Sequence, residues 1–110
     1  MKRLILILAV QVVFAASAVA GGNVAAGKEK SQTCVACHGD AGMSAVATFP
    51  NIAGQYEDYL YVALTDYKSG ERNNAIMSGI VAALNDQDMK DLAAYYASLE
   101  GLGNLGLPSK

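Results

Sequence analysis

The stretch Cys34-Val35-Ala36-Cys37-His38 contains both cysteines and the single histidine of the 110-residue chain. Two cysteines three positions apart, with a histidine directly after the second, form the pattern of c-type haem attachment. On one helical turn each thiol can add to one haem vinyl group, and the imidazole then lies beneath the iron as its proximal ligand. The stretch therefore predicts one covalent haem c held by Cys34 and Cys37, with His38 as an axial iron ligand.

Three other interpretations of this stretch remain open. A thioredoxin-like redox pair shares the Cys-x-x-Cys spacing but belongs in a βαβ pattern, and the sequence has no strand pattern. A structural zinc site needs four ligands, of which the stretch supplies three. A plain disulfide between Cys34 and Cys37 leaves His38 without a role. Haem attachment uses all three residues and needs no second cluster of cysteine or histidine ligands, which the sequence lacks.

The first twenty residues have the pattern of a secretory signal. Lys2 and Arg3 precede an apolar run that ends at Phe14, and Ala18-Val19-Ala20 is a small-x-small cleavage site. We therefore expect cleavage after Ala20. An uncleaved membrane anchor is the alternative, although the apolar run is shorter than the roughly 20 residues that a spanning helix needs.

Cleavage leaves residues 21–110, which we predict to be a single domain located in the periplasm. Loss of Lys2 and Arg3 leaves six basic and ten acidic residues, a net charge of −4. This charge argues against nucleic acid as a partner, because nucleic-acid binding requires a basic surface. The expected partners are redox proteins with basic docking patches, found by electrostatic steering. A membrane would be contacted only transiently, through partner complexes.

Helical patterns cover most of the mature chain. The expected helices run from Asn23 to Thr33, from Gln55 to Ser69, around Ile76 to Leu84, and from Asn85 to about Leu99. Asn23 and Asn85 are predicted N-caps, and Gly70 occupies the C′ position of the second helix. Gly27 in the first helix would suit a close crossing with another helix.

Two of these helices have clear faces. On the second helix, an apolar stripe is expected to pack on the haem and a polar set to face solvent. The stripe is Tyr56, Tyr59 or Leu60, Ala63, Leu64 and Tyr67, and the polar set is Glu57, Asp58, Asp66 and Lys68. On the last helix, a stripe suited to packing on the first helix comprises Met89, Leu92, Tyr96 and Leu99.

The second axial ligand of the iron is expected to be a methionine, because the only histidine is already used. Met43 follows His38 closely in sequence and lies on the same side of the macrocycle. Met89 belongs to the apolar stripe of the last helix. Met77 lies in a separate segment that is free to close over the opposite face, so we predict that Met77 is the ligand. An open or water-bound iron is the alternative.

The loop from Gly39 to Pro50 is expected to wrap one face of the haem. An iron-bound imidazole usually donates its second N–H to a carbonyl or carboxylate, which fixes the ring. The carbonyl of Pro50 is our candidate acceptor for His38. A simple turn proline is the other interpretation.

A His/Met pair leaves no vacant iron position for a substrate and raises the reduction potential, which favours an electron carrier over an enzyme. The sequence offers no second histidine for acid–base catalysis, no Ser/His/Asp set and no phosphate-binding glycine loop.

Several segments of the chain, in register over nearly all of the mature sequence, resemble a class I cytochrome c of the small soluble bacterial monohaem type. They are also similar to one half of the dihaem bacterial cytochromes c. The segments are Cys34–Gly39 with Gly42, Phe49–Gln55, Tyr67–Arg72, Met77, Leu84–Asp86 and Leu92–Tyr96.

The resemblance implies an all-α, cytochrome c-type fold of about four helices around one haem, with the first and last helices crossing. It implies that Met77 is the distal ligand and that the Pro50 carbonyl holds His38. It also places Arg72 and Asn74 in the region of the haem propionates, although a solvated polar link is an equally good interpretation of these two residues.

The function implied is periplasmic transfer of one electron between respiratory or dehydrogenase partners. One alternative is a haem c subunit of a stable multi-subunit oxidoreductase. Another is a gas-binding haem sensor with an open sixth site.

Overall fold

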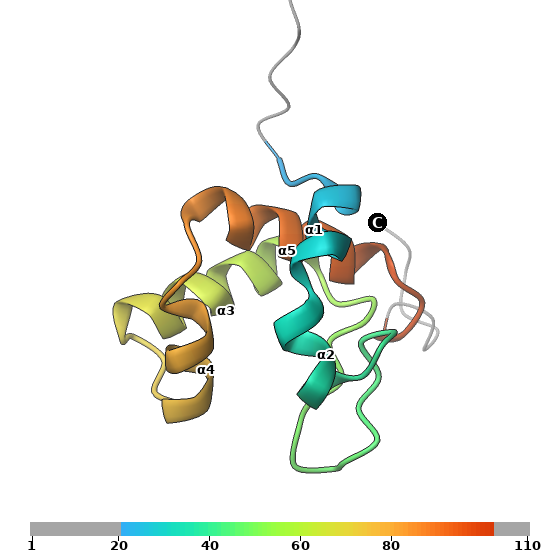
Figure 1. Cartoon of the computed structure of the whole chain (residues 1–110), viewed down its shortest axis with the longest axis horizontal. Helices are drawn as coiled ribbons and strands as arrows, with labels where there is room; N and C mark the ends of the chain where they lie inside the picture. Colours follow the sequence, from blue (N-terminus) through green and yellow to red (C-terminus); the bar gives the residue numbers. More distant parts are fainter. Residues whose placement is uncertain (1–20, 103–110) are drawn as a thin grey trace, which may run out of the picture.

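The computed structural model describes residues 21–102, which form five α-helices and no strand (Figure 1). The helices are α1 (Val24–Lys30), α2 (Gln32–His38), α3 (Glu57–Ser69), α4 (Ala75–Val81) and α5 (Asp86–Ser98). The predicted all-α fold is therefore confirmed. The predicted signal segment, residues 1–20, lies outside the described residues. Within residues 21–102, none of the helices has the length and apolar character needed to cross a bilayer.

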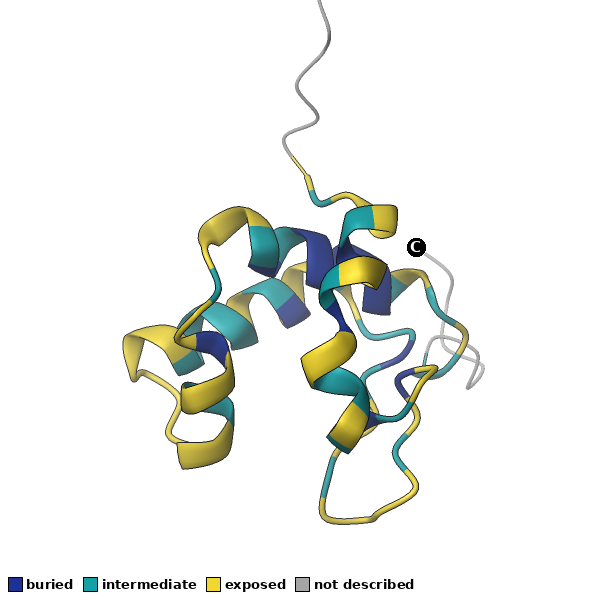
Figure 2. Ribbon diagram, in the orientation of Figure 1, coloured by how far each residue is buried: buried dark blue, intermediate teal, exposed yellow. Residues whose placement is uncertain are grey.

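Helices α1 and α5 cross and lie against each other in Figure 1, and α5 also forms the buried apolar core together with Leu60 of α3. Gly27 permits this approach, because a Cβ atom there would lie 2.0 Å from the carbonyl oxygen of Asp91. Every residue of α5 from Asp91 to Tyr96 is buried, and this helix forms the dark centre of Figure 2. The predicted close crossing of the first and last helices is thus confirmed, with Gly27 at the contact.

Asp91 stabilises the crossing of α1 and α5 through hydrogen bonds. It is a buried acidic residue, only 3% exposed. Its Oδ1 accepts hydrogen bonds from the Asn23 backbone N–H and the Gln87 Nε2, each at 2.8 Å. Its Oδ2 accepts from Lys30 Nζ at 2.6 Å. Burial alone raises the pKa of this carboxyl, but the hydrogen bonds from Lys30, Asn23 and Gln87 outweigh burial and lower the pKa from 3.8 to about 2.

Acid is expected to weaken the α1–α5 crossing. Because the pKa of Asp91 is lower in the folded chain, the carboxylate stabilises the fold above pH 4, and this contribution is lost as the pH falls from about 4 to 2. The shift corresponds to about 2 kcal/mol. Asp91→Asn should therefore lower the free energy of unfolding at pH 7 by at least this amount and flatten its dependence on pH below 4. Urea unfolding of the purified protein between pH 2 and 7 measures both effects.

The matched control is Asp58→Asn, which removes an exposed carboxylate from α3. Asp58→Asn should leave the pH dependence of the free energy of unfolding below pH 4 unchanged. Equal pH profiles for Asp91→Asn and the unmodified protein would contradict the assigned role of Asp91.

The helix predicted from Asn23 to Thr33 is in fact two helices. The hydroxyl of Ser31 donates to the Lys28 carbonyl at 2.7 Å, and α1 ends at Lys30. A serine side chain that bonds to the backbone in this way competes with the continuing helix. The chain turns at Ser31, and α2 starts at Gln32 as a separate helix.

The bounds of the other helices differ by a few residues from those predicted. Tyr56 has an extended backbone, so α3 begins at Glu57, and the prediction that Tyr56 belongs to the helical apolar stripe is wrong. Helix α4 ends at Val81, before the predicted Leu84. The predicted caps are present: Asn85 and Asp88 form a capping box at the start of α5, and Gly70 ends α3 in the left-handed conformation with φ of 87°.

Candidate functional site

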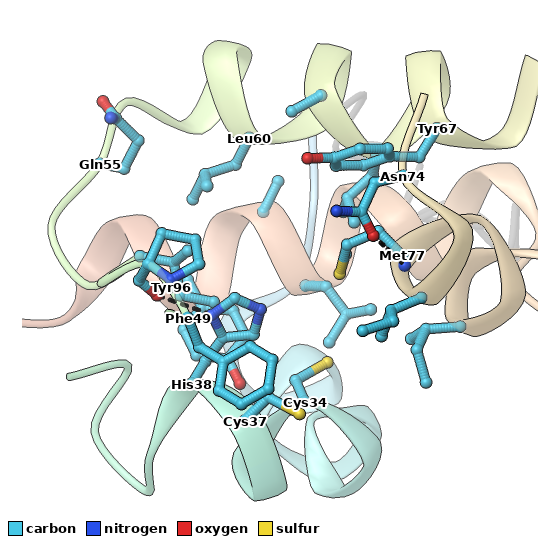
Figure 3. Close-up of a pocket in the computed structure, with 18 of the residues that line it drawn as sticks. Cys34, Cys37, His38, Phe49, Gln55, Leu60, Tyr67, Asn74, Met77 and Tyr96 are labelled. Atoms are coloured by element: carbon cyan, nitrogen blue, oxygen red, sulfur yellow. Dashed lines mark hydrogen bonds between the residues drawn. The ribbon is translucent and has the colours of Figure 1, made fainter. Parts of the chain in front are cut away.

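A cavity of about 330 Å³ with mostly apolar walls lies between α2, α3, α4, α5 and the loop that joins α2 to α3 (Figure 3). All seven residues that the sequence analysis predicted to belong to the site lie on the cavity wall. They are Cys34, Cys37, His38, Pro50, Arg72, Asn74 and Met77. They come from segments that are far apart in the sequence. The fold therefore gathers the whole predicted site around one space.

His38 is buried at the end of α2, and its Nδ1 lies 2.7 Å from the carbonyl oxygen of Pro50. A carbonyl can only accept, so Nδ1 carries the proton and Nε2 keeps a free lone pair. The loop is held in place because the Gly42 carbonyl accepts from the N–H groups of Ile52 at 2.9 Å and Ala53 at 3.1 Å. This arrangement brings the Pro50 carbonyl to the ring and leaves Nε2 of His38 available as a metal ligand.

Cys34 and Cys37 are one helical turn apart on α2, and both are free and partly buried. Burial raises the pKa of the Cys34 thiol. Redox-active Cys-x-x-Cys pairs have lowered thiol pKa values, so the environment of Cys34 argues against a thioredoxin-like pair. Within residues 21–102, no group of three His, Cys, Asp or Glu side chains is arranged to hold a metal ion.

The three methionines considered as ligands lie in different surroundings. Met43 is 49% exposed on the loop and does not line the cavity. Met89 is buried in α5, also away from the cavity wall. Met77 lines the cavity, and in Figure 3 its sulfur lies across the space from the His38 ring. The Asn74 side chain accepts the Met77 backbone N–H at 3.0 Å and caps the start of α4.

The walls of the cavity fit a large apolar group such as haem. Ile76 and Ile80 on α4 are 59% and 37% exposed, and both side chains line the cavity, as does Tyr59 on α3. Helix α4 packs chiefly on α3, so its apolar residues have little other chain to cover them. A flat apolar group in this space would bury them, and Nε2 of His38 and the Met77 thioether are suitable ligands for its iron.

A single cation lies among the residues that line the cavity. Nη1 of Arg72 donates to the Tyr59 hydroxyl at 3.3 Å, and the guanidinium lies over the Tyr67 ring, 4.9 Å from its centroid. No carboxylate in residues 21–102 forms an ion pair with Arg72. These contacts hold Arg72 by neutral side chains, which leaves its charge available for an anionic group in the cavity.

Sequence reasoning missed Lys68, which it assigned to a solvated face of α3. The Nζ atom donates to the carbonyl of Ala82 at 3.2 Å and to the carbonyl of Leu84, just beyond the end of α4. A lysine in the last turn of a helix is expected from the dipole of its own helix. The sequence therefore contains no sign of the contact with a different segment.

Known proteins similar to this chain include several cytochromes. A family model described as cytochrome c matches residues 24–100. A cytochrome c4 from Pseudomonas aeruginosa is 42% identical over 98 residues, which are 89% of this chain and 49% of the relative. Cytochrome c-554(548) from Halomonas halodenitrificans is 43% identical over 82 residues, 72% of this chain and 99% of the relative. A protein from Thiomonas intermedia named thiosulfate dehydrogenase electron acceptor is 38% identical, over 88% of this chain and 45% of the relative.

The fold is similar to that of a solved cytochrome. The structure of reduced cytochrome c4 from Pseudomonas stutzeri matches with a TM-score of 0.70 at 40% identity, over 73% of this chain and 47% of that chain. This chain thus spans about half the length of the cytochrome c4 proteins and nearly all of cytochrome c-554(548).

Proposed function

This chain belongs to the cytochrome c family, and on that premise we propose that it is a periplasmic electron carrier whose haem iron is held by His38 and Met77. The family implies a covalently bound haem c and a function in electron transfer. The observation that carries the proposal is the position of His38 and Met77 on facing sides of one apolar cavity, with both cysteines on its wall.

Each residue of the site has a proposed role. Cys34 and Cys37 hold the haem by thioether bonds, and His38 binds the iron through Nε2 while the Pro50 carbonyl fixes the ring. Met77 supplies the second axial ligand from α4. When bound, the haem supplies an iron that takes up and releases one electron. The hydrogen bond of 2.7 Å from His38 to the Pro50 carbonyl supports this set of roles, because it fixes the orientation of the imidazole ring.

The two proposed iron ligands are neutral and fixed by the fold, which suits electron transfer rather than catalysis. The Asn74 side chain holds the backbone of Met77, and the Pro50 carbonyl holds the ring of His38. The same ligands can therefore remain in place in both oxidation states, which keeps structural change small. If His38 and Met77 both bind the iron, they would leave no position on it for a substrate or a gas molecule.

Arg72 and Asn74 are proposed to hold the haem propionates. Support comes from Arg72, which lies at the cavity wall and forms no ion pair within 4.0 Å with a carboxylate of residues 21–102. The stacking of the guanidinium on Tyr67 limits its motion and favours a bidentate contact with a carboxylate. Asn74 is expected to contribute the free amide N–H groups of its side chain.

The partners of this chain are proposed to be redox proteins with basic docking patches, including a dehydrogenase as electron donor. The name of the Thiomonas intermedia relative supports a dehydrogenase donor. The net charge of −4 for residues 21–110 supports steering by a basic partner. The periplasm is proposed because the leader pattern and covalent haem attachment both point to export.

Two small oxidants, one cationic and one anionic, test this function in the haem-loaded protein. The reduced protein should be oxidised both by a cationic cobalt–phenanthroline complex and by anionic ferricyanide, as followed by stopped-flow absorbance. The rate with the cation should fall severalfold as ionic strength rises from 10 to about 200 mM, and the rate with the anion should rise. A haem that neither oxidant oxidises on this timescale would contradict electron carriage, and identical salt trends would contradict the charge argument.

A further inference from the structure

Lys68 links the end of α3 to the end of α4. Its ammonium group donates to the carbonyl oxygens of Ala82, at 3.2 Å, and of Leu84. Ala82 is the C-cap residue of α4, and the carbonyl of the preceding residue, Val81, accepts the Leu84 N–H at 3.0 Å. The last carbonyl groups of a helix lack partners within the helix and carry a partial negative charge. A cation at this point therefore both completes the hydrogen bonding and suits the helix dipole.

Helix α4 is a short element that depends on such contacts. It has seven residues, packs chiefly on α3, and presents Ile76 and Ile80 to the cavity rather than to another helix. Val81 is its one fully buried side chain. At its start, the Asn74 side chain accepts the Met77 N–H. The two ends of α4 are thus fixed by polar contacts, one from Asn74 and one from Lys68.

We propose that Lys68 is a positioning residue that anchors the carboxyl end of α4 to α3 and thereby keeps Met77 directed across the cavity toward His38. This inference rests on the proposed role of Met77 as an iron ligand. Lys68 itself does not line the cavity, so it acts on the site only through the position of α4. Without this contact, the carboxyl end of α4 keeps only the burial of Val81 and the hydrogen bond from the Leu84 N–H to the Val81 carbonyl, and the Met77 sulfur would leave the iron more often.

Competition by added imidazole measures this effect in the oxidised, haem-loaded protein. Imidazole binds iron only when the Met77 sulfur is away, so its apparent affinity reports how often the sulfur leaves. Lys68→Met keeps the apolar stem but removes the donors, and should raise the affinity about fivefold, the factor expected from one ordinary hydrogen bond at an exposed site. The far-red charge-transfer band from the methionine sulfur to iron should weaken in parallel.

Two control variants isolate the contact from the loss of charge. Lys68→Arg retains donors at the same position and should keep imidazole affinity close to that of the unmodified protein. Lys28→Met removes one positive charge from α1, a helix that packs on α5 and α2, and should have no effect on imidazole binding. Circular dichroism with urea then compares the global stability of all three variants.

Met77→Ala, titrated alongside, separates failure of this inference from failure of the proposed function. If Met77→Ala raises imidazole affinity strongly and Lys68→Met does not, Met77 is the ligand and the positioning role of Lys68 is overturned. A loss of urea stability in Lys68→Met with unchanged imidazole affinity also overturns it, because the contact would then be structural only. If Met77→Ala itself binds imidazole like the unmodified protein, both proposals fall.

Discussion

Replacing Cys34 and Cys37 together with alanine is expected to abolish covalent haem attachment and to leave a chain without its native helix content. The haem is proposed to fill a cavity of about 330 Å³, whose walls include the otherwise exposed Ile76, Ile80 and Tyr59. At roughly 24 cal/mol per Å³ of cavity, leaving this space unfilled costs up to about 8 kcal/mol. Whole domains are stable by only about 5–15 kcal/mol, so the loss is comparable with the total.

The double cysteine variant is assessed by two measurements on protein from the same export host. Acidic organic extraction should remove all haem from the variant and none from the unmodified protein, and far-ultraviolet circular dichroism should show a large loss of helix. Val35→Ala is the control, because Val35 lies between the two cysteines on α2 but does not line the cavity. A haem-free double variant with full helicity and a sharp unfolding transition would show that the chain folds without the haem.

Replacing Met77 with alanine should open one axial position of the iron and lower its reduction potential on the order of a few tenths of a volt. The shift follows because a thioether ligand favours the reduced iron, and axial ligands tune haem potentials over about 0.8 V. The far-red charge-transfer band of the oxidised protein should disappear. Spectroelectrochemical titration measures the potential and the spectrum together.

The other two methionines outside the predicted leader supply the controls for the Met77 variant. Met43→Ala changes an exposed loop side chain and should leave both potential and band unchanged. Met89→Ala removes a buried core side chain, so it should cost about 2–5 kcal/mol of stability but retain the far-red band. An unchanged potential in Met77→Ala, or loss of the band in either control, would move the ligand to a different residue.

The parts of the site that the sequence predicts are those defined by local spacing. Cys34, Cys37 and His38 lie on one helical turn, so five consecutive residues are enough to identify their chemistry. Pro50 lies in the loop that directly follows the haem motif, which made its carbonyl a reasonable candidate acceptor before the distance to His38 was known. The caps at Asn85 and Gly70 are likewise local, because each depends on the backbone of its own helix.

The features that the sequence did not predict depend on contacts between distant segments. The hydroxyl of Ser31 could equally face solvent inside a continuous helix, so periodicity alone did not place the break between α1 and α2. Lys68 and Asp91 have the pattern of ordinary polar helix residues. Their roles follow only from the packing of α4 beside α3 and of α1 across α5. Helical periodicity identifies which face is buried but does not identify the partner of a given charge.

Met77 could be chosen among the three methionines from the position of its segment in the sequence. Met77 was favoured because a polar link separates its segment from the haem motif, which allows the chain to close over the opposite face. Met43 and Met89 lie away from the cavity, one on the exposed loop and one in the α5 core. The position of α4 that brings Met77 to the cavity depends on Asn74 and Lys68, and no pattern in the sequence indicated the contribution of Lys68.

The central claim is that one haem is covalently bound in the cavity of an exported chain, and the intact mass of the protein tests it most directly. The full-length chain is expressed in a host with a c-type haem attachment system, extracted from the periplasm, denatured and weighed by mass spectrometry. The expected mass is that of residues 21–110 plus one haem. A polypeptide mass with no haem added, in a fraction where the host attaches haem to a known cytochrome c, would contradict the account.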